Sequence, residues 1–288
     1  MISVVIPAHN EGLVIGRLLG QLAGQATAGG GTGRDLDVIV VSNGSTDGTA
    51  RIAASFGPGV RVLSIPVASK REALRAGDRA AAGFPRVYVD ADVELGVPDI
   101  RALAAALSQP GVLAAAPRRA LRTEHSPWPV RWYYDVWSRL PEVQRGLFGR
   151  GVIAVSEPGH QRLAALPPLL ADDLAASLSF TPAERRVVAS ACAIVRAPRT
   201  VPDLVRRRVR VVTGVAQLER AAPVPDAART RLADLAALAR GQPSLAPRVL
   251  VFLAVTVIAR LAARRALARR DYSTWLRDES SRRPAGPG

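Results

Sequence analysis

Two aspartates separated by one residue, Asp90 and Asp92, follow a short apolar run from Val87 to Val89. Such a run is typical of a strand buried on both faces, so both carboxylates are expected where that strand ends. In an open α/β sheet, ligands bind in the crevice beside the carboxyl ends of the strands. Two hard oxygen ligands there suit Mg²⁺ or Mn²⁺, and such a cation suits a diphosphate. The other interpretation is that the aspartates only cap the next turn, where Asp is common.

The elements that would position this pair follow from the hydrophobic pattern. Apolar runs alternate with helix-compatible runs over the first 95 residues, which predicts an α/β fold with a doubly wound, mostly parallel sheet. The expected strands are residues 3–6, 38–41, 60–65, 87–89 and 112–116, and the expected helices are 13–22, 46–56, 69–82, 99–106, 203–218 and 226–240. The segment 117–151 is expected to be irregular and rich in aromatic residues.

Polar residues also follow the first two expected strands. The first strand runs into Pro7-Ala8-His9-Asn10-Glu11, and the second runs into the loop from Ser42 to Thr49, where Gly44 and Gly48 permit tight turns. Each loop alone is an ordinary strand-to-helix connection. Three loops with polar tips at one edge of a sheet predict a binding site.

These motifs carry a family resemblance. The chain resembles family-2 inverting glycosyltransferases with the GT-A fold, closely over residues 2–95 and loosely to about 215. The motifs, in order, are Val5-Ile6-Pro7-Ala8-His9-Asn10-Glu11, Ser42-Asn43-Gly44-Ser45-Thr46-Asp47-Gly48-Thr49, Lys70 with Ala73, Leu74 and Gly77, and Asp90-Ala91-Asp92. The resemblance implies inverting transfer of a sugar from a nucleotide diphosphate sugar, with a divalent metal held at Asp92 and Asp90.

The resemblance also implies residue roles by position. Pro7, Ala8 and Glu11 would lie against the nucleoside, and Asp47 and Lys70 would help to shape the nucleotide pocket. Asp90, with Ala91 beside it, would approach the ribose and the metal. Family members commonly have Asp-Asp before the Gly-Ser, whereas this chain has Ser42-Asn43. The nucleotide base therefore stays open among UDP, GDP and dTDP sugars.

A second acidic pair, Asp172-Asp173, follows an apolar approach at an expected helix start. Acidic residues in a first helical turn are favoured by the helix macrodipole, and this alone implies no catalysis. The pair also resembles the Glu-Asp motif of the family, whose second carboxylate is the catalytic base. That register assigns the base to Asp173 rather than to Asp172.

Arginines and glycines complete the candidate site. Arg207 to Val211 resembles a degenerate Gln/Arg-x-x-Arg-Trp motif with Val in place of Trp, and Arg207 and Arg210 can face one diphosphate or simply be solvated. Glycines around Arg150, including Gly149, predict a loop that bends close to ligand or merely joins two elements. The aromatic residues of segment 117–151 are either core or a platform for an acceptor. They are Trp128, Trp132, Tyr133, Tyr134 and Trp137.

The basic charge of the chain is concentrated in its C-terminal third. The formal charge is +15, and residues 196–288 hold 19 Lys/Arg against 7 Asp/Glu. Stacking aromatics and zinc-ligand spacings are sparse there, which favours an anionic membrane surface over nucleic acid. The run from Val249 to Ala259 is too short to predict a spanning helix. It predicts a helix in a membrane interface, or one packed on protein.

We therefore expect a GT-A catalytic domain at residues 1–215 and a basic helical extension at 216–288. No secretory signal is visible, and one cysteine fits a reducing compartment, so the expected location is cytoplasmic, peripheral on the inner face of a membrane. The acceptor would be a glycan or lipid-linked hydroxyl. The alternatives are a sugar-nucleotide pyrophosphorylase and a non-catalytic scaffold that binds nucleotide sugars. The Gly31-Thr32-Gly33-Arg34 run is only a passing likeness to the pyrophosphorylase loop.

Overall fold

The computed structural model describes residues 1–28, 35–166, 172–221 and 230–268. The chain divides into two compact units. The sheet unit comprises Met1–Leu121, Arg150–Leu166 and Ser179–Val195, and the helical unit comprises Arg122–Gly149, Pro167–Leu178 and Arg196–Gly288. The boundary expected after residue 215 falls inside helix α9, Val201–Ala221. The division at that residue stays a prediction.

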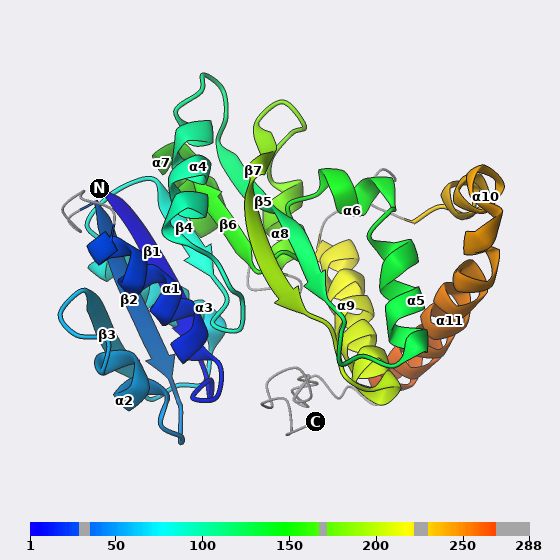
Figure 1. Cartoon of the computed structure of the whole chain (residues 1–288), viewed down its shortest axis with the longest axis horizontal. Coiled ribbons are helices and arrows are strands. Elements are labelled where there is room, and N and C mark those ends of the chain that lie inside the picture. Colours follow the sequence, from blue (N-terminus) through cyan, green and yellow to red (C-terminus); the bar gives the residue numbers. More distant parts are fainter. Residues whose placement is uncertain (29–34, 167–171, 222–229, 269–288) are drawn as a thin grey trace. The chain divides into compact units, whose positions relative to one another are not determined.

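Seven strands form one mixed sheet in the order β3-β2-β1-β4-β6-β5-β7 (Figure 1). The strands are β1 Ile2–Ala8, β2 Leu36–Asn43, β3 Val60–Ile65, β4 Arg86–Val89, β5 Ala114–Arg122, β6 Val152–Val155 and β7 Arg185–Arg196. β1 pairs in parallel with β2 and β4, β2 pairs in parallel with β3, and β6 runs antiparallel to both β4 and β5. The expected α/β class is therefore confirmed, with β6 as the reversed strand.

Helices connect the strands of the sheet unit and make up most of the helical unit. The sheet unit contains α1 Ile15–Ala28, α2 Thr49–Ala54, α3 Lys70–Ala80, α4 Val97–Leu107 and α7 Glu157–Ala164. The helical unit contains α5 Trp128–Trp137, α6 Pro141–Arg145, α8 Asp172–Leu178, α9, α10 Leu232–Gly241, a 3₁₀ turn at Pro243–Leu245 and α11 Ala246–Ala268.

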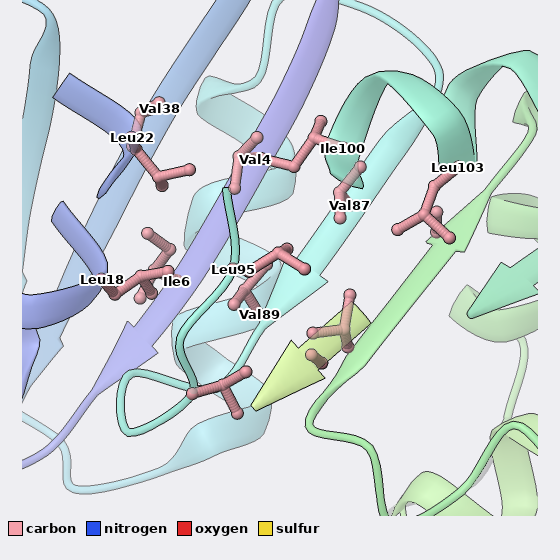
Figure 2. Close-up of a cluster of buried hydrophobic side chains, with 14 of the residues drawn as sticks. Val4, Ile6, Leu18, Leu22, Val38, Val87, Val89, Leu95, Ile100 and Leu103 are labelled. Carbon is pink, nitrogen blue, oxygen red and sulfur yellow. The ribbon is translucent and has the colours of Figure 1, made fainter. Parts of the chain in front are cut away.

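The core of the sheet unit lies on both faces of the parallel strands because side chains alternate along a strand. Val4 and Ile6 of β1 face Leu18 and Leu22 of α1 within a buried cluster that also takes in α4 (Figure 2). Val5, between them, faces α3 in a second cluster. Helix α3 approaches closely because Gly77 has no side chain: a Cβ there would lie 2.3 Å from the Val5 Cγ1.

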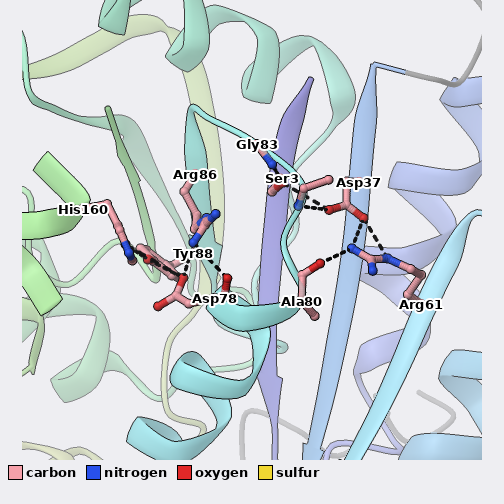
Figure 3. A network of polar contacts seen from close by, with 10 residues as sticks. Ser3, Asp37, Arg61, Asp78, Ala80, Gly83, Arg86, Tyr88 and His160 are labelled. Carbon is pink, nitrogen blue, oxygen red and sulfur yellow. Dashed lines mark hydrogen bonds and ion pairs between the residues drawn. The ribbon is translucent and has the colours of Figure 1, made fainter. Parts of the chain in front are cut away.

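Polar side chains close the amino ends of the parallel strands (Figure 3). Asp78 at the end of α3 accepts from the buried Arg86 Nη1 at 3.0 Å and from the Tyr88 hydroxyl at 2.8 Å. The same hydroxyl oxygen lies 2.8 Å from His160 Nδ1. Asp37 of β2 accepts from the fully buried Ser3 hydroxyl of β1 at 3.1 Å. These hydrogen bonds fasten α3 and α7 to the sheet.

In the helical unit, α11 packs against α5 and α9. Tyr133 of α5 is fully buried and stacks on Phe252 of α11, with ring centroids 4.9 Å apart. Burial raises the pKa of Tyr133 to about 12, although Arg208 of α9 acts in the opposite direction. Tyr133 and Tyr134 therefore belong to a core, whereas Trp128 is 54% exposed.

The structure differs from the sequence analysis in two places. The segment 117–151 is not irregular, since β5 continues to Arg122 and helices α5 and α6 follow. Both helices have proline at their first positions, where the missing N–H costs nothing. The C-terminal helix is also longer than the apolar run, because α11 passes Arg260 without interruption. Residues Pro243–Arg265 are long and apolar enough to cross a membrane by length and composition, a test that core helices also pass.

Candidate active site at the carboxyl edge of the sheet

Three loops meet at the carboxyl edge of the parallel strands because β1, β2 and β4 are parallel neighbours. β1 ends at Ala8, β2 at Asn43 and β4 at Val89. The sequence-predicted residues of the sheet unit therefore lie on this edge. They are Pro7, Ala8, Glu11, Asn43, Asp47, Lys70, Asp90, Ala91 and Asp92.

The loop after β1 is held by the loop after β2. Asp47 accepts from the Gly12 N–H at 3.0 Å and from the Thr49 N–H at 2.9 Å, while the Glu11 N–H donates to the Thr49 hydroxyl at 2.8 Å. Burial opposes ionisation of Asp47, but the hydrogen bonds from Thr49 and Gly12 prevail and lower its pKa. Asn10 has φ +51°, a left-handed conformation that Asn tolerates. Glu11 is consequently buried at the edge.

Asn43, which departs from the family pattern, acts as a donor in this structure. The side-chain Nδ2 of Asn43 donates to the Ala8 carbonyl at 3.0 Å. The backbone carbonyl oxygen of Asn43 lies 2.7 Å from His9 Nδ1. A carbonyl only accepts, so His9 Nδ1 carries the proton of that bond. An aspartate at position 43 has no proton to give to Ala8. The amide thus clamps the end of β1 to the end of β2.

Asp90 is fixed on two sides. Its N–H donates to the Gly151 carbonyl at 2.8 Å, and its carboxylate pairs with Lys70 Nζ at 2.7 Å. Lys70 is 28% exposed and Asp90 34%. Lys70 is also the only lysine among the 39 Lys and Arg residues of the chain. A lysine ammonium is a compact point charge, unlike the planar fork of arginine, so a single oxygen of Asp90 or of a phosphate suits it.

Gly151 and Arg150, which directly precede β6, support the turn at Asp90. Gly151 has φ +64°, and a Cβ on it would lie 2.4 Å from Val93 Cγ2, so only glycine fits here. Arg150 is 3% exposed, and its Nη1 donates to the Pro117 carbonyl at 3.0 Å. Burial lowers the pKa of Arg150 to about 10. Gly149, the predicted ligand-loop residue, also has a positive φ of +67°.

The residues present fit a cation that is shared with a diphosphate. Among the described residues, no group of three or more His, Cys, Asp or Glu side chains is arranged to hold a metal. Asp90 and Asp92 would supply two carboxylates. Mg²⁺ is commonly bound by one or two carboxylates together with substrate phosphates and water. The donor set therefore suits a metal that arrives with its substrate rather than a closed protein site.

The other sequence-predicted residues belong to the helical unit. Asp172 and Asp173 begin α8, as expected; the Asp173 side chain is exposed, and that of Asp172 lies outside the described residues. One turn further, Ser177 Oγ accepts from the Leu147 N–H at 3.0 Å, which anchors α8. Arg207 and Arg210 lie on α9, with Arg210 exposed. The likeness to a pyrophosphorylase loop at residues 31–34 is outside the described residues.

Sequence reasoning singled out the glycines around Arg150, Gly151 among them, but missed the contacts that Arg150 and Gly151 make. The feature of the sequence that indicates this turn is the pair of glycines flanking a single arginine, Gly149-Arg150-Gly151. Both glycines have positive φ in the structure. Their partners, Pro117 and Asp90, are distant in sequence, so the pattern of residues alone does not reveal the contacts.

The chain is similar to known proteins in sequence and in fold. The model of the family described as Glycosyl transferase family 2 matches residues 3–159, which is more than half of the chain. Among curated proteins, a validoxylamine A glucosyltransferase of Streptomyces hygroscopicus subsp. limoneus is 32% identical over 117 residues, covering 38% of this chain and 24% of that protein. The match thus spans about a quarter of that relative's length.

Solved structures share the fold. A mannosyltransferase from Pyrobaculum calidifontis, in complex with GDP-Man and Mn²⁺, has a TM-score of 0.55 and 21% identity, covering 96% of this chain and 83% of its own. A glucosyl-3-phosphoglycerate synthase from Mycobacterium tuberculosis, in complex with UDP, has a TM-score of 0.54 and 25% identity, covering 78% of this chain and 81% of its own.

Proposed function

Since the family match extends over more than half of its length, the chain belongs to glycosyl transferase family 2, and we propose that it moves a hexose from a nucleotide diphosphate sugar to an acceptor hydroxyl with inversion. The chain is a glycosyltransferase with the GT-A fold, which disfavours the pyrophosphorylase and scaffold alternatives. The observation that carries the proposal is the Asp90-Ala91-Asp92 turn, fixed by Lys70 and Gly151 at the carboxyl edge of the sheet.

The edge residues would bind the donor. Pro7, Ala8 and Glu11 would contact the nucleoside, and the hydrogen bonds that Asp47 accepts would hold their loop in place. Asn43 leaves no carboxylate at this position to accept from a uracil N–H, so the donor would be a UDP, GDP or dTDP hexose, and binding of each decides among them. The two structural neighbours carry GDP-Man and UDP.

A divalent cation would be held by Asp92 and Asp90. Such an ion neutralises the charge that develops on a leaving diphosphate. Lys70 would orient Asp90 through their ion pair at 2.7 Å. Arg210, with Arg207, would add cationic stabilisation to the departing diphosphate.

Asp173 would be the general base. It would take the proton of the acceptor hydroxyl as that oxygen attacks the anomeric carbon, and the nucleotide diphosphate would leave with the electron pair of the glycosidic bond. The acceptor would be a glycan or a lipid-linked hydroxyl of the cell envelope. The reaction would take place in the cytoplasm, at the inner face of the membrane.

A test of the base is nucleotide release by Asp173→Asn with a panel of UDP, GDP and dTDP sugars. The expected loss in turnover is about 10²–10⁴-fold, the usual contribution of a general base. Asp172→Asn, its neighbour in the same helical turn, is the matched control and should keep most activity. Full activity of Asp173→Asn would remove the base assignment.

The single lysine offers an independent test of donor binding. An amine-reactive acylating reagent can modify only Lys70 and the chain's α-amino group, so mass spectrometry separates the two sites. The correct sugar nucleotide with Mn²⁺ should slow acylation of Lys70 at least tenfold, on the order expected at saturating ligand. Acylation of Lys70 at an unchanged rate under saturating donor would contradict the placement of the donor.

A further inference from the structure

Helix α11 is apolar on both sides, although only one side packs inside the chain. Its inner side is buried against α5 and α9 through Val249, Phe252, Val255, Ala259 and Ala263. The opposite side carries large apolar residues that are half to two-thirds exposed. They are Leu250 at 68%, Val257 at 52%, Ile258 at 52% and Leu261 at 49%, here called the outer stripe.

The spacing of the outer stripe makes it continuous. Positions 250, 257, 258 and 261 differ by seven, eight and eleven residues, so they fall on one side of an α-helix. Ala254, also exposed, fills the gap between Leu250 and Val257. Contiguous exposed apolar surface of this kind marks an interaction site, whereas single exposed apolar residues are ordinary.

The charge beside the outer stripe indicates its partner. Arg260, Arg264 and Arg265 are exposed and adjoin the C-terminal end of the stripe. Residues 196–288 hold 19 Lys/Arg against 7 Asp/Glu, so a second copy of this region would bring like charges together. An apolar face bordered by arginines matches a bilayer that carries anionic headgroups.

An exposed tryptophan lies toward the same end of α11. Asp135 of α5 pairs with Arg248, and Tyr133 stacks on Phe252, so residue numbers fall along α5 as they rise along α11. The two helices are therefore antiparallel (Figure 1). This direction carries the start of α5, where the 54% exposed Trp128 packs edge-on against Trp132, toward the arginine end of α11. Tryptophan is enriched where proteins meet the headgroup region.

The packing of α11 separates lying in a membrane from crossing it. Lipid cannot surround α11, because α9 covers its inner side through Val205, Val209 and Val212. Arginines 206, 207, 208 and 210 of α9 would then enter the hydrocarbon with it, which is costly. A helix with one face on protein and one free apolar face fits the interface plane.

We propose that the outer stripe docks the protein on an anionic membrane, with α11 lying in the interface and Arg260, Arg264 and Arg265 at the headgroups. This proposal identifies the surface that would bind the membrane, and it rests on the membrane location given under the proposed function. Its measurement needs no glycosyl transfer, so its failure and that of the proposed reaction are distinguishable.

The experiment is co-sedimentation of the full chain with vesicles of phosphatidylcholine alone or with phosphatidylglycerol added. The wild type should bind the anionic vesicles, and Ile258→Glu and Leu261→Glu should each lower the partition coefficient at least about tenfold, given the apolar area removed. Leu232→Glu on α10 is the matched control, because Leu232 is 75% exposed and the charge change is identical. Changing Arg264 and Arg265 to Gln should weaken only the anionic binding, about fivefold for each arginine.

Three results would overturn the proposal. The wild type would bind neither kind of vesicle, or Leu232→Glu would weaken binding as much as Ile258→Glu. The third is a wild-type dimer, seen by light scattering, that Ile258→Glu converts to a monomer without vesicle binding. That result would assign the outer stripe to a second copy. Slowed acylation of Lys70 by donor in every variant would show that the sheet unit stays intact throughout.

Discussion

Both ends of the parallel strands carry polar side chains, but the two ends use them differently. At the amino edge, Arg86 is 4% exposed and is bonded to Asp78, which also accepts from Tyr88. At the carboxyl edge, Lys70 and Asp90 form one ion pair and remain about a third exposed. Buried groups that are bonded to one another stabilise a fold, whereas partly exposed charges beside a turn can exchange partners with a ligand.

Left-handed residues occur at both edges, since Gly57 before β3 has φ +83°, but nothing lies within 4 Å of a Cβ added there. The carboxyl edge contains left-handed residues at Asn10, Gly44 and Gly151, with φ between +51° and +64°. A Cβ at Gly44 would lie 2.7 Å from the Ala68 nitrogen, so this turn too admits only glycine. Backbone in sparsely populated conformations clusters at functional sites. The carboxyl edge therefore fixes the geometry of its side chains, whereas the amino edge contributes stability.

The same substitution at the two edges should have opposite effects on turnover and on stability. Asp92→Asn should lower turnover about 10³-fold while the free energy of unfolding changes by less than about 1 kcal/mol, because a metal-holding carboxylate acts on transition-state charge. Asp78→Asn, the same chemical change at the amino edge, should do the reverse. It should cost about 2 kcal/mol of stability, because it removes the charged partner of the buried Arg86, and leave kcat unchanged. Steady-state kinetics and urea unfolding of both variants check this, and equal effects on stability would contradict it.

The next effect sharpens the role of backbone geometry at the carboxyl edge. Gly151→Ala should destabilise the protein by about 2–4 kcal/mol and lower kcat at least about tenfold, since the new Cβ meets Val93 and displaces the carbonyl that holds Asp90. Gly57→Ala is the matched control, with φ +83° and nothing within 4 Å of the added Cβ. It should cost only about 1 kcal/mol, the conformational term alone. If both variants unfold at the same urea concentration, the close contact at Gly151 has no consequence.

The sequence predicts much of one edge and little of the other. Continuous apolar runs predicted β1 to β4, and parallel topology then brings Ala8, Asn43 and Asp90 together without further information. The buried bonds of the amino edge join residues whose proximity depends on how α3 and α7 pack, as for His160 and Tyr88. No period or propensity encodes such pairs.

The same reason explains what was wrong beyond residue 116. β6 has four residues and β7 begins with two arginines, so neither gives a clear strand pattern. Asn43 was interpreted as a missing carboxylate, whereas the structure makes it a donor to Ala8, a role visible only once β1 and β2 are paired. The C-terminal helix exceeds the apolar run because arginine is a good helix former, so Arg260 interrupts only the hydrophobicity pattern.

The smallest expected effect is a pH dependence confined to the amino edge. Tyr88 donates to Asp78, so its oxygen accepts from His160 Nδ1–H. Burial lowers the pKa of His160 below its ordinary 6.5; Arg86 acts in the same direction, whereas Asp78 and Glu157 oppose it. Below pH 6.5 the unfolded chain therefore binds a proton that the folded chain resists, and stability falls as pH decreases through that window.

His160→Gln should remove this slope. The wild type should lose up to about 1 kcal/mol of unfolding free energy between pH 7 and 5.5 that the variant does not lose, which urea titrations at each pH would measure. His125→Gln, at an exposed position before α5, is the control and should keep the wild-type slope. An identical pH dependence in wild type and His160→Gln would mean that the amino-edge network does not resist protonation. Turnover at pH 7 should be unaffected by His160→Gln, because His160 belongs to the amino-edge network.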